Sequence, residues 1–413
     1  MRLIALAIAL LANSASAVQP APGVWSPERA ARIDAVFNQY VEDGRLPGAV
    51  LLVLHDGRVV YEKSFGWADK ESSRRMTNDA LFRIASQSKA ITAAAAMILV
   101  EEGKLLLNDP VSKYIPAFAK TTVSVPNEMR TEIVPAKRQI TLKDLLTHSA
   151  GISYGMESRV ASLYEAKGLG PATGYGYYFS DKDETICDSM EKLATLPFVA
   201  QPGDRWVYGY GNDVVGCVVE RVAKQPLDAF IRERITEPLR MFDTFFYVPK
   251  DKAGRLTTVY SSGDDGKAVR APEGAKGQGH YAGGPQKSFS GGAGLVSTAH
   301  DYARFLEMIR LGGELDGVRV LSPRAAALLT VNAVGTLMLN SGMGWSLAFE
   351  TTERFGANGM SSAGSYGWGG AYGSVYRVDP TERLTMVFLM QLVPNRTDLR
   401  EKFPNLVHQA LVR

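Results

Sequence analysis

Hydrophobic and polar positions along the chain predict strands at both ends of the sequence. An apolar run covers residues 48–55, Asp56 and Gly57 are typical of a two-residue hairpin turn, and residues 58–65 read as the returning strand. Near the other end, apolar runs predict three more strands, at residues 345–350, 374–379 and 384–392. Strands at both ends favour one antiparallel sheet that is assembled from the two termini.

Helical patterns surround these strands and dominate the middle of the chain. Helices are predicted at residues 26–40, 90–100, 141–148, 212–224 and 300–311, with a last helix near the C-terminus whose first turn would suit Pro404. The change of pattern predicts a sheet domain made of residues 18–110 and 292–413. Residues 111–291 are predicted to be an inserted all-helical lobe, with a cleft between the two parts.

Composition and charge are those of a globular protein. The chain has 413 residues, of which 46% are hydrophobic and 22% charged, and a net charge of +3. No basic run or aromatic-rich basic patch is present, so no nucleic-acid partner is expected. The five histidines are scattered and no cysteine pair has ligand spacing, so neither a metal nor a cofactor is expected.

The N-terminus has the pattern of a secretory leader. Arg2 precedes an apolar stretch at residues 3–12, and Ala15-Ser16-Ala17 provides small residues for cleavage. We expect cleavage after Ala17, which makes residues 1–17 a signal peptide, and a periplasmic or secreted protein. The apolar stretch is too short for a membrane span, and no other stretch is long and apolar enough.

The two cysteines allow two interpretations. In an oxidising compartment Cys187 and Cys217 could form one disulfide. Cys217 lies in an apolar helical run, however, where a buried free thiol is common. The second interpretation is the one that the sequence favours.

Ser86 has the surroundings expected of a nucleophile. It precedes a run of small apolar residues that is typical of a buried central helix, and free N–H groups at a helix start can hold a developing anion. Lys89 lies one helical turn further along, so its amine can approach the Ser86 hydroxyl. A lysine that is buried away from water can serve as a base. Ser86 and Lys89 are therefore the first catalytic candidates.

Two other serine motifs are weaker candidates. Ser189 and Lys192 repeat the Ser-x-x-Lys spacing within a polar, acidic stretch, which indicates a surface. Ser153 lies in a Gly-x-Ser-x-Gly sequence, which in a nucleophile elbow follows a strand and precedes a helix. Here a helix is predicted before it and none after it, so Ser153 is interpreted as structural.

Two further segments complete a candidate site. Tyr208 follows a Pro-Gly turn and precedes a helix, and a tyrosine beside an ammonium group can act as a general base. Trp368-Gly369-Gly370-Ala371 precedes a predicted strand, and its glycines allow a close backbone approach. If this strand edge faces Ser86, the backbone N–H groups of Ser86 and Ala371 form an oxyanion hole.

Three motifs follow one another in an order that resembles the serine β-lactamase and penicillin-binding-protein superfamily. They are Ser86-x-x-Lys89, Tyr208 and Trp368-Gly369-Gly370. They look most like the class C branch and its esterase relatives, the family VIII carboxylesterases. Further matches lie at residues 101–105, 145–151 and 292–298. The resemblance covers nearly the whole chain after the predicted leader. It implies a β-lactamase-like α+β fold, with an antiparallel sheet flanked by helices, an inserted helical lobe and a site between them.

Two departures from the lactamase pattern bear on the substrate. The lactamase branch usually has Tyr-x-Asn, whereas Tyr208-Gly209-Tyr210 has a tyrosine in place of the asparagine. Tyr210-Gly211-Asn212 matches the motif two residues later, which leaves two registers; we favour Tyr208 because its distance to the next helix resembles the esterase spacing. Trp368-Gly369-Gly370 replaces the usual Lys-Thr-Gly. An indole in place of a cation favours neutral, partly apolar esters. Tyr210, Trp368, Gly369 and Gly370 are therefore predicted to bind the substrate.

The resemblance and the residues predict hydrolysis of short-chain carboxylic esters through an acyl-enzyme. Ser86 attacks the carbonyl after Tyr208, or a Tyr208/Lys89 pair, takes its proton; the sequence leaves open which group does so. A small-molecule ester is the expected partner, and β-lactams are a second candidate. The alternatives are a β-lactamase or D-Ala-D-Ala carboxypeptidase, a non-catalytic penicillin-binding-like sensor, and an α/β-hydrolase built on Ser153.

Overall fold

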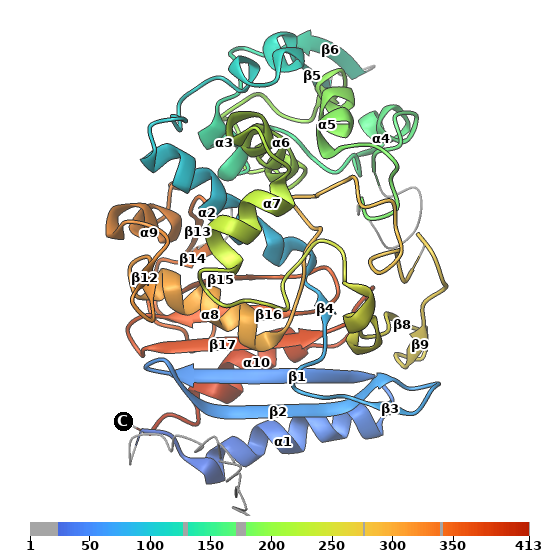
Figure 1. Ribbon diagram of the computed structural model, residues 1–413, viewed down its shortest axis with the longest axis vertical. Coiled ribbons are helices and arrows are strands. Elements are labelled where there is room, and N and C mark those ends of the chain that lie inside the picture. Colours follow the sequence, from blue (N-terminus) through green and yellow to red (C-terminus); the bar gives the residue numbers. More distant parts are fainter. Residues whose placement is uncertain (1–23, 127–130, 171–178, 276, 339–341, 413) are drawn as a thin grey trace, which may run out of the picture.

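A sheet of eight strands forms the centre of the computed structural model, which describes residues 24–126, 131–170, 179–275, 277–338 and 342–412. The strand order is β13-β14-β15-β16-β17-β1-β2-β3, and neighbouring strands are antiparallel (Figure 1). The strands are β1 Gly48–His55, β2 Arg58–Asp69, β3 Arg74–Arg75, β13 Met343–Trp345, β14 Glu350–Thr352, β15 Tyr366–Gly369, β16 Val375–Asp379 and β17 Leu384–Met390. Because β1 pairs with β17, strands from the two ends of the chain meet inside one sheet, which confirms the predicted assembly.

The turns of this sheet are partly as predicted. Asp56 and Gly57 both have a positive φ, 53° and 75°, as a two-residue hairpin between right-twisted strands requires. The strand predicted at residues 345–350 is wrong, because residues 346–349 form the turn between β13, which ends at Trp345, and β14, which begins at Glu350. The Ser346 hydroxyl accepts hydrogen bonds from the N–H groups of Ala348 and Phe349, which bends the chain there.

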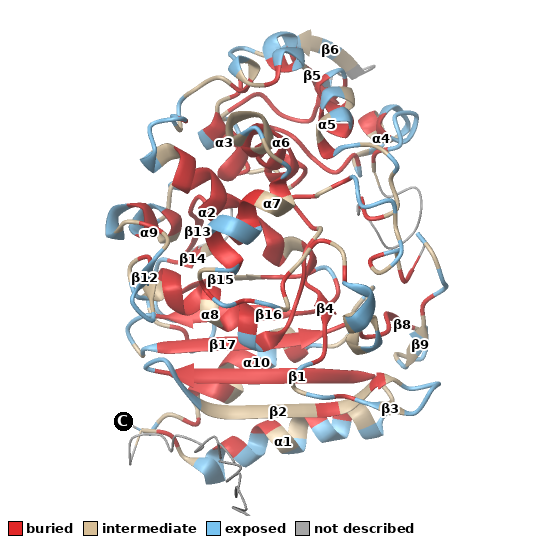
Figure 2. Ribbon diagram, viewed as in Figure 1, coloured by how far each residue is buried: buried red, intermediate tan, exposed pale blue. Residues whose placement is uncertain are grey.

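Alternate residues of β1 supply two separate cores. Ala49, Leu51 and Val53 pack with α1 (Pro27–Glu42) and α10 (Leu399–His408) on one face of the sheet. Their neighbours on the other face pack in the core of α2 (Ser88–Glu101) and α8 (Ala299–Arg310). Figure 2 shows β1, β17 and α2 as buried along nearly their whole length. Since β1 is covered on both faces, it is apolar throughout rather than alternating.

The last helix departs from prediction at Pro404. This residue lies inside α10 instead of in its first turn. A proline within a helix removes one backbone hydrogen bond, at a cost of about 3 kcal/mol. Phe403 and Val407 on the same helix are buried against the sheet. We conclude that packing of this apolar face keeps the helix continuous through the proline.

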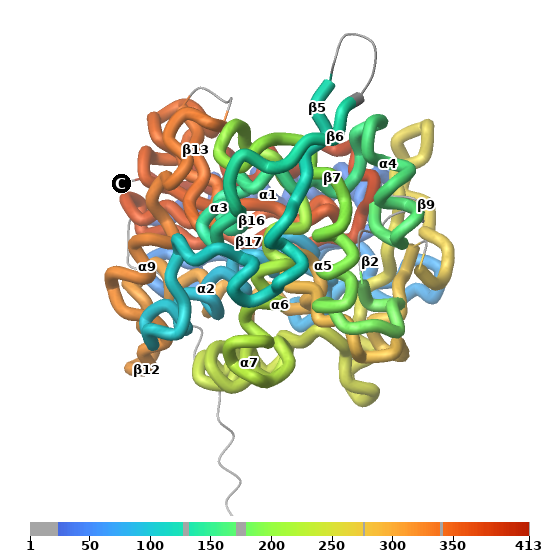
Figure 3. Tube along the Cα trace, turned by 90° about the horizontal axis from the view of Figure 1, so that it is seen from above, coloured from blue at the N-terminus to red at the C-terminus, as the bar shows by residue number. Residues whose placement is uncertain are grey.

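The first part of the middle of the chain, from residue 111 to α6 (Gly211–Ala223), lies at the opposite end of the molecule from α1 and β2 (Figures 1 and 3). The helices of the middle of the chain are α3 Leu142–Leu146, α4 Ser158–Glu165, α5 Ile186–Ala194, α6 Gly211–Ala223 and α7 Leu227–Ile231, with short helical turns η2 Val111–Lys113, η3 Pro116–Lys120, η4 Arg232–Thr236 and η5 Lys250–Arg255. It also contains strands, so the all-helical prediction is corrected: β5 Thr122–Pro126, β6 Thr131–Pro135, β7 Pro197–Phe198, β8 Tyr260–Ser262 and β9 Ala268–Arg270. The later strands β8 and β9 instead lie beside the sheet, where the Ala268 N–H donates to the Gly44 carbonyl oxygen and Arg270 pairs with Asp69 of β2. The domain boundaries at residues 111 and 291 remain predictions.

The remaining elements are short and lie beside the sheet. They are η1 Ala85–Gln87, β4 Phe82–Arg83, β10 Val296–Ser297, β11 Glu314–Leu315, β12 Val318–Arg319 and α9 Pro323–Thr330. None of the helices in the described ranges has the length and apolar character needed to cross a bilayer. The predicted leader, residues 1–17, lies outside the described residues.

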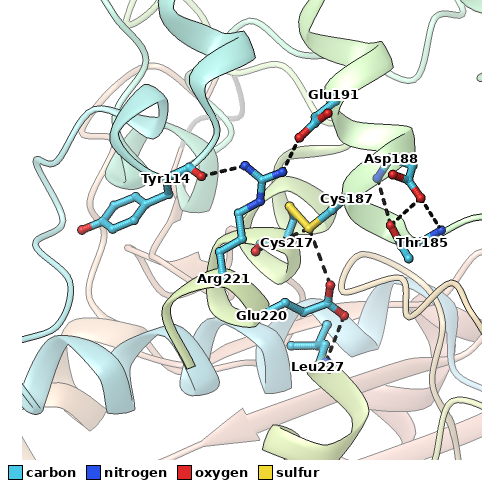
Figure 4. Close-up of a disulfide and its surroundings, with 9 residues drawn as sticks. All are labelled: Tyr114, Thr185, Cys187, Asp188, Glu191, Cys217, Glu220, Arg221 and Leu227. Atoms are coloured by element: carbon cyan, nitrogen blue, oxygen red, sulfur yellow. Dashed lines mark hydrogen bonds and ion pairs between the residues drawn. A yellow bond between two sulfur atoms is a disulfide. The ribbon is translucent and has the colours of Figure 1, made fainter. Parts of the chain in front are cut away.

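A disulfide joins two helices in the middle of the chain. Cys187 on α5 is bonded to Cys217 on α6 (Figure 4), so the favoured interpretation of Cys217 as a free thiol is wrong. Glu220 lies beside this bond, with its Oε2 atom 3.5 Å from Cys187 Sγ and its Oε1 atom accepting from the Leu227 N–H at 3.0 Å. A disulfide sulfur carries no proton, so only a protonated Glu220 carboxyl can donate a hydrogen bond to it.

Glu220 should make the stability of the protein depend on pH. Burial raises the pKa of its carboxyl from an ordinary 4.5 to about 7. Between these values the folded protein holds a proton that the unfolded chain has lost, so the free energy of unfolding falls as the pH rises. In the unchanged protein, this carboxyl should lower the free energy of unfolding by about 1–3 kcal/mol between pH 4.5 and pH 8. Glu220→Gln should remove that loss, so the variant should keep more of its stability at pH 8. Chemical denaturation at the two pH values measures the difference.

The exposed Glu165 offers a matched control, since it forms no ion pair with any described residue. Glu165→Gln should keep the pH slope of the unchanged protein. Equal slopes in all three proteins would show that Glu220 is not the responsible group.

Candidate active site

The backbone around Ser86 is held in an uncommon conformation. Strand β4 pairs with β10, and the chain then passes through Ala85, whose φ is +46°, into the short turn η1 that contains Ser86. A non-glycine residue in the left-handed region costs on the order of 1 kcal/mol and is often found at functional sites. Within residues 80–99, Ser86 is the one position that is not buried. The fold thus exposes this hydroxyl at the mouth of the buried helix α2.

Lys89 is the group that contacts the Ser86 hydroxyl. It is 1% exposed, and its Nζ atom lies 3.2 Å from Ser86 Oγ, 2.9 Å from the Tyr154 hydroxyl and 2.7 Å from the Gly292 carbonyl oxygen. Among the described residues, no carboxylate forms an ion pair with Lys89. A neutral amine satisfies the same contacts, donating to Tyr154 and Gly292 and accepting from Ser86. The geometry therefore allows Lys89 to take the serine proton directly.

Tyr154 is a site residue that the sequence analysis missed. It lies in the loop after α3, next to Ser153, and is 9% exposed. Its hydroxyl is the partner of Lys89, and its ring packs edge-on against Tyr210 at 4.8 Å between centroids. The sequence does contain one clue to Tyr154. It lies three residues after Gly151, where the segment 145–151 that matches the superfamily ends. The motif carries no tyrosine there, so nothing singled it out.

Tyr208 lies in the same site, with a different orientation from the one predicted. Its ring centroid is 4.7 Å from Lys89 Nζ, and its hydroxyl accepts a hydrogen bond from Trp368 Nε1 at 2.9 Å. Lys89 donates to Tyr154 instead. Because the Tyr208 oxygen accepts from the indole, its own hydrogen can be donated to another acceptor. The structure brings together Ser86, Lys89, Tyr208 and Trp368, as the sequence analysis expected.

Aromatic rings fix the position of Tyr208. The ring centroids of His148, Trp368 and Trp206 lie 4.6, 5.4 and 5.7 Å from that of Tyr208. Burial lowers the pKa of His148 well below its ordinary value. This imidazole is therefore neutral near pH 7. It forms part of the wall behind Tyr208 and does not carry charge there.

Tyr210 does not take the role that was predicted for it. It is 1% exposed and is absent from the described residues that line the cavity beside Ser86. Its hydroxyl accepts from the Gly170 N–H, and its ring supports Tyr154. The predicted direct contact between Tyr210 and the substrate is corrected, because the side chain points into the core of the lobe. Between the two possible registers, the structure places Tyr208 in the site.

The segment 368–371 lies against the Ser86 turn, as the oxyanion-hole prediction requires. A Cβ atom on Gly370 would come within 2.8 Å of the Ile84 carbonyl oxygen, two residues before Ser86, so glycine permits this close approach. Ala371 and Ser86 line the same cavity. That their N–H groups hold the oxyanion remains a prediction.

Asp213 holds the turn that meets Lys89. Its Oδ1 atom accepts from the Ser290 hydroxyl at 2.5 Å and from the Gly292 N–H at 3.1 Å, while Gly292 presents its carbonyl to Lys89. Burial raises the pKa of this carboxyl above its ordinary value. A Cβ atom on Gly292 would lie 2.3 Å from the carboxylate, which explains the glycine. Asp213 is thus a positioning residue for Lys89.

The competing serine motifs have no catalytic surroundings. Ser153 Oγ donates to Glu157 at 2.7 Å and accepts from the Gly155 N–H, which makes it part of a turn. Ser189 donates to Glu184, and Lys192 forms an ion pair with the same carboxylate. Each serine donates to a glutamate only four or five residues away in sequence, and neither serine is among the described residues that line the cavity beside Ser86. Ser153 is structural, as predicted, whereas the surface prediction for Ser189 is wrong, because Ser189 is 0% exposed on the buried face of α5.

A cavity of about 320 Å³ opens beside Ser86. This volume is at the lower end of the range for small-molecule sites. Its described lining consists of Ser86, Tyr154, Met156, Tyr208, Ala293, Trp368, Gly369, Gly370, Ala371 and Arg400. A larger cavity of about 470 Å³, lined by Phe242, Phe246 and Phe289, contains none of the reactive groups. The glycine- and tyrosine-rich sequence of residues 168–178 predicts a loop that shapes the pocket, and residues 171–178 of this loop lie outside the described residues.

No described group of three or more His, Cys, Asp or Glu side chains is arranged to hold a metal ion. The reactive groups of the site are a serine hydroxyl with a lysine within hydrogen-bond distance and two phenols, and they lie beside a narrow cavity. Together with the antiparallel sheet and its flanking helices, this arrangement defines a serine hydrolase.

Comparison with known proteins gives the family. The sequence model described as Beta-lactamase matches residues 33–411, and the chain belongs to this family. Esterase EstB from Burkholderia gladioli is 32% identical over 376 residues, covering 87% of this chain and 90% of that protein. Protein Rv1367c from Mycobacterium tuberculosis is 34% identical over 383 residues, with the same coverage.

Solved structures agree with this assignment. EstCE1, described as a hydrolase with promiscuous acyltransferase activity, superimposes with a TM-score of 0.77 and 27% identity. The match covers 93% of this chain and 98% of that one. The β-lactamase-like fold that was expected from the sequence is confirmed.

Proposed function

We propose that the protein is a carboxylesterase of the family VIII type, which cleaves short-chain esters through an acyl-enzyme on Ser86. The observation that carries the proposal is the 3.2 Å contact between Lys89 Nζ and Ser86 Oγ at the base of a small, mainly apolar cavity. The similarity to an esterase and to a hydrolase over most of the chain supports it. The indole of Trp368 in the cavity wall favours an ester with little polar surface.

Acylation uses Lys89 and Tyr208 in different roles. Ser86 Oγ attacks the ester carbonyl while its proton moves to the neutral Lys89 amine. When the tetrahedral intermediate collapses, the bond between the carbonyl carbon and the alcohol oxygen breaks, and this oxygen takes the proton of Tyr208. The orientation of Tyr208 supports this role, because its hydroxyl accepts from Trp368 and so keeps its hydrogen for the leaving group. The acyl-enzyme then carries a lysine ammonium and a tyrosine phenolate.

Deacylation reverses these transfers. The Tyr208 phenolate takes a proton from water, the resulting hydroxide attacks the acyl carbonyl, and the Lys89 ammonium returns its proton to Ser86 Oγ. Acid and alcohol leave, and both side chains regain their starting protonation. The backbone N–H groups of Ser86 and Ala371 hold the oxyanion in both steps.

A substrate panel tests the proposal against its nearest alternative, the hydrolysis of β-lactams. We expect kcat/KM for p-nitrophenyl acetate and butyrate to exceed that for nitrocefin by at least about tenfold, because Trp368-Gly369-Gly370 lacks the lysine and threonine of the lactamase branch. Both rates are measured on the same purified protein. A faster nitrocefin rate would reverse the order, and a stable acyl adduct without turnover would indicate a sensor.

The proposed compartment is the periplasm or the exterior of the cell, after removal of residues 1–17. The disulfide between Cys187 and Cys217 supports this proposal, since such bonds persist in oxidising compartments. N-terminal sequencing of the mature protein from a bacterial host tests it. A mature chain that begins at Met1 would argue against export.

A further inference from the structure

Another cavity, with a volume of about 470 Å³, is lined by β5, α4 and residues 199–205. β5 and α4 lie at the end of the molecule far from α1 (Figure 1). The described lining shares no residue with the cavity beside Ser86. Two arginines, Arg159 of α4 and Arg205, line it together with Ser124 of β5. The cavity therefore brings two cations and a hydroxyl together, away from the candidate active site.

The two arginines share one hydrogen-bond acceptor. Arg159 Nη2 donates to the Val199 carbonyl oxygen at 2.7 Å, and Arg205 Nη2 donates to the same oxygen at 2.9 Å. The two nitrogens are therefore at most 5.6 Å apart, which is the sum of these distances. Each guanidinium carries a permanent positive charge and five N–H donors. Because the two charges repel each other at this distance, the arrangement is unfavourable without an anion.

The carboxylates beside the two arginines are engaged elsewhere. Glu157 accepts a hydrogen bond from the Ser153 hydroxyl at 2.7 Å. Asp204 lines the cavity, but its Oδ2 atom lies 3.8 Å from Lys137 Nζ, so its charge is matched by that lysine. Within the described ranges, neither guanidinium forms an ion pair or a second hydrogen bond. Most of their donors are thus left for a ligand.

Two buried donors also lack an acceptor among the described residues. They are the hydroxyl of Ser124, a residue that is 1% exposed, and the Nε–H of Arg159. Ser124 follows Val123 and Val199 follows Phe198, and these two preceding residues are paired between the parallel strands β5 and β7. Ser124 therefore lies on the strand beside the carbonyl that both arginines bind. Since buried donors are almost always satisfied, they indicate a ligand that supplies several acceptor oxygens.

We propose that this cavity binds a phosphate group, either as the free ion or at the end of a small phosphorylated molecule. A phosphate carries close to two negative charges near pH 7 and offers several strong acceptor oxygens. Two guanidiniums and a hydroxyl match it, because arginine pairs with phosphate through two parallel hydrogen bonds. The proposal goes beyond the ester chemistry at Ser86 and does not depend on it.

A bound phosphate would also brace the loops that lead to the candidate active site. The Val199 N–H donates to the Gly151 carbonyl oxygen, three residues before Tyr154. The Val207 N–H, directly before Tyr208, donates to another carbonyl of the same loop. Because a ligand that binds only the folded protein stabilises it, saturating phosphate should raise the Tm of the unchanged protein.

Calorimetric titration of the purified protein with inorganic phosphate tests the proposal. At low ionic strength we expect a Kd below about 1 mM, and an affinity at least about tenfold higher than for chloride. Arg159→Gln and Arg205→Gln should each weaken phosphate binding by about tenfold or more and remove the rise in Tm. Phosphate binding no tighter than chloride binding, or an unchanged affinity in either variant, would overturn the proposal.

Arg396 provides a matched control, because it too donates to a backbone carbonyl, that of Gly263, but lies outside the described lining. Arg396→Gln should keep the phosphate affinity, and a tenfold loss there would show a general charge effect and overturn the site. Glycerol 3-phosphate in the same titration distinguishes the two sources of the phosphate group. Tighter binding than inorganic phosphate supports a phosphorylated molecule, and weaker binding supports the free ion.

Ser124→Ala keeps the test decisive if the arginine variants do not fold. Its hydroxyl has no described partner, so its removal should leave the Tm without phosphate unchanged. Phosphate binding should weaken by about three- to tenfold, because a hydrogen bond to a charged group is lost. Weaker binding in a folded Ser124→Ala variant supports the site, and an unchanged affinity overturns it.

Discussion

Replacing Ser86 with alanine should abolish ester hydrolysis and labelling by a phosphonate. We expect kcat/KM for p-nitrophenyl butyrate to fall by about a thousandfold or more, because Lys89 would then have no hydroxyl to activate. The substitution removes one oxygen from a partly exposed position, so the fold should be retained. Steady-state kinetics and intact-protein mass spectrometry after phosphonate treatment measure the two losses.

Ser153→Ala is the control for this result. Ser153 Oγ is engaged with Glu157 and with the Gly155 N–H, so its loss should cost about 1–2 kcal/mol of stability and leave labelling intact. Labelling that persists in Ser86→Ala and disappears in Ser153→Ala would move the nucleophile to Ser153. The α/β-hydrolase alternative would then be restored.

Tyr208→Phe should slow the hydrolysis of esters whose alcohol needs a proton in order to leave. For ethyl butyrate we expect kcat/KM to fall by about 100- to 10,000-fold, the usual range for loss of a general acid. Nitrophenolate leaves without a proton, so the loss for p-nitrophenyl butyrate should be much smaller. The measurement is kcat/KM for the two esters, which reports the steps up to acyl-enzyme formation.

Tyr154→Phe gives a comparison within the same site. Its hydroxyl contacts Lys89 at 2.9 Å, so its removal should disturb the deprotonation of Ser86. This step is common to all esters, and both substrates should slow by a similar factor. If Tyr154→Phe shows the stronger dependence on the leaving group, the two phenols exchange the roles that we assign to them.

The sheet could be predicted because its signals are local. The apolar run of β1 and the Asp56-Gly57 turn specify a hairpin within a few residues of sequence. Residues 345–350 were misassigned because their apolar character comes from burial in a turn, whose shape depends on the Ser346 hydroxyl. Pro404 was misplaced for a related reason: packing on the sheet, which sequence does not display, outweighs local preference.

The site was only partly predictable, again because contacts that depend on the tertiary fold are not visible in the local sequence. Ser86 and Lys89 lie one helical turn apart, so their contact follows from helix geometry. Tyr154 and Arg400 reach the cavity from loops and helices that only the tertiary fold brings together. Tyr210 was assigned to the substrate from its spacing beside Tyr208, yet neighbouring side chains in a turn point in different directions. The partner of the Tyr208 hydroxyl likewise comes from a distant strand.

The pairing of β1 with β17 also has a consequence for biosynthesis. Ala49 pairs with Met390, so the centre of the sheet cannot form until the chain has left the ribosome as far as Met390. Contacts between residues so distant in sequence slow folding, since a long loop must close first. Until then β1, apolar on both faces, has no partner on one edge and is open to aggregation. Chaperones that hold the nascent chain extended would therefore raise the yield of native protein.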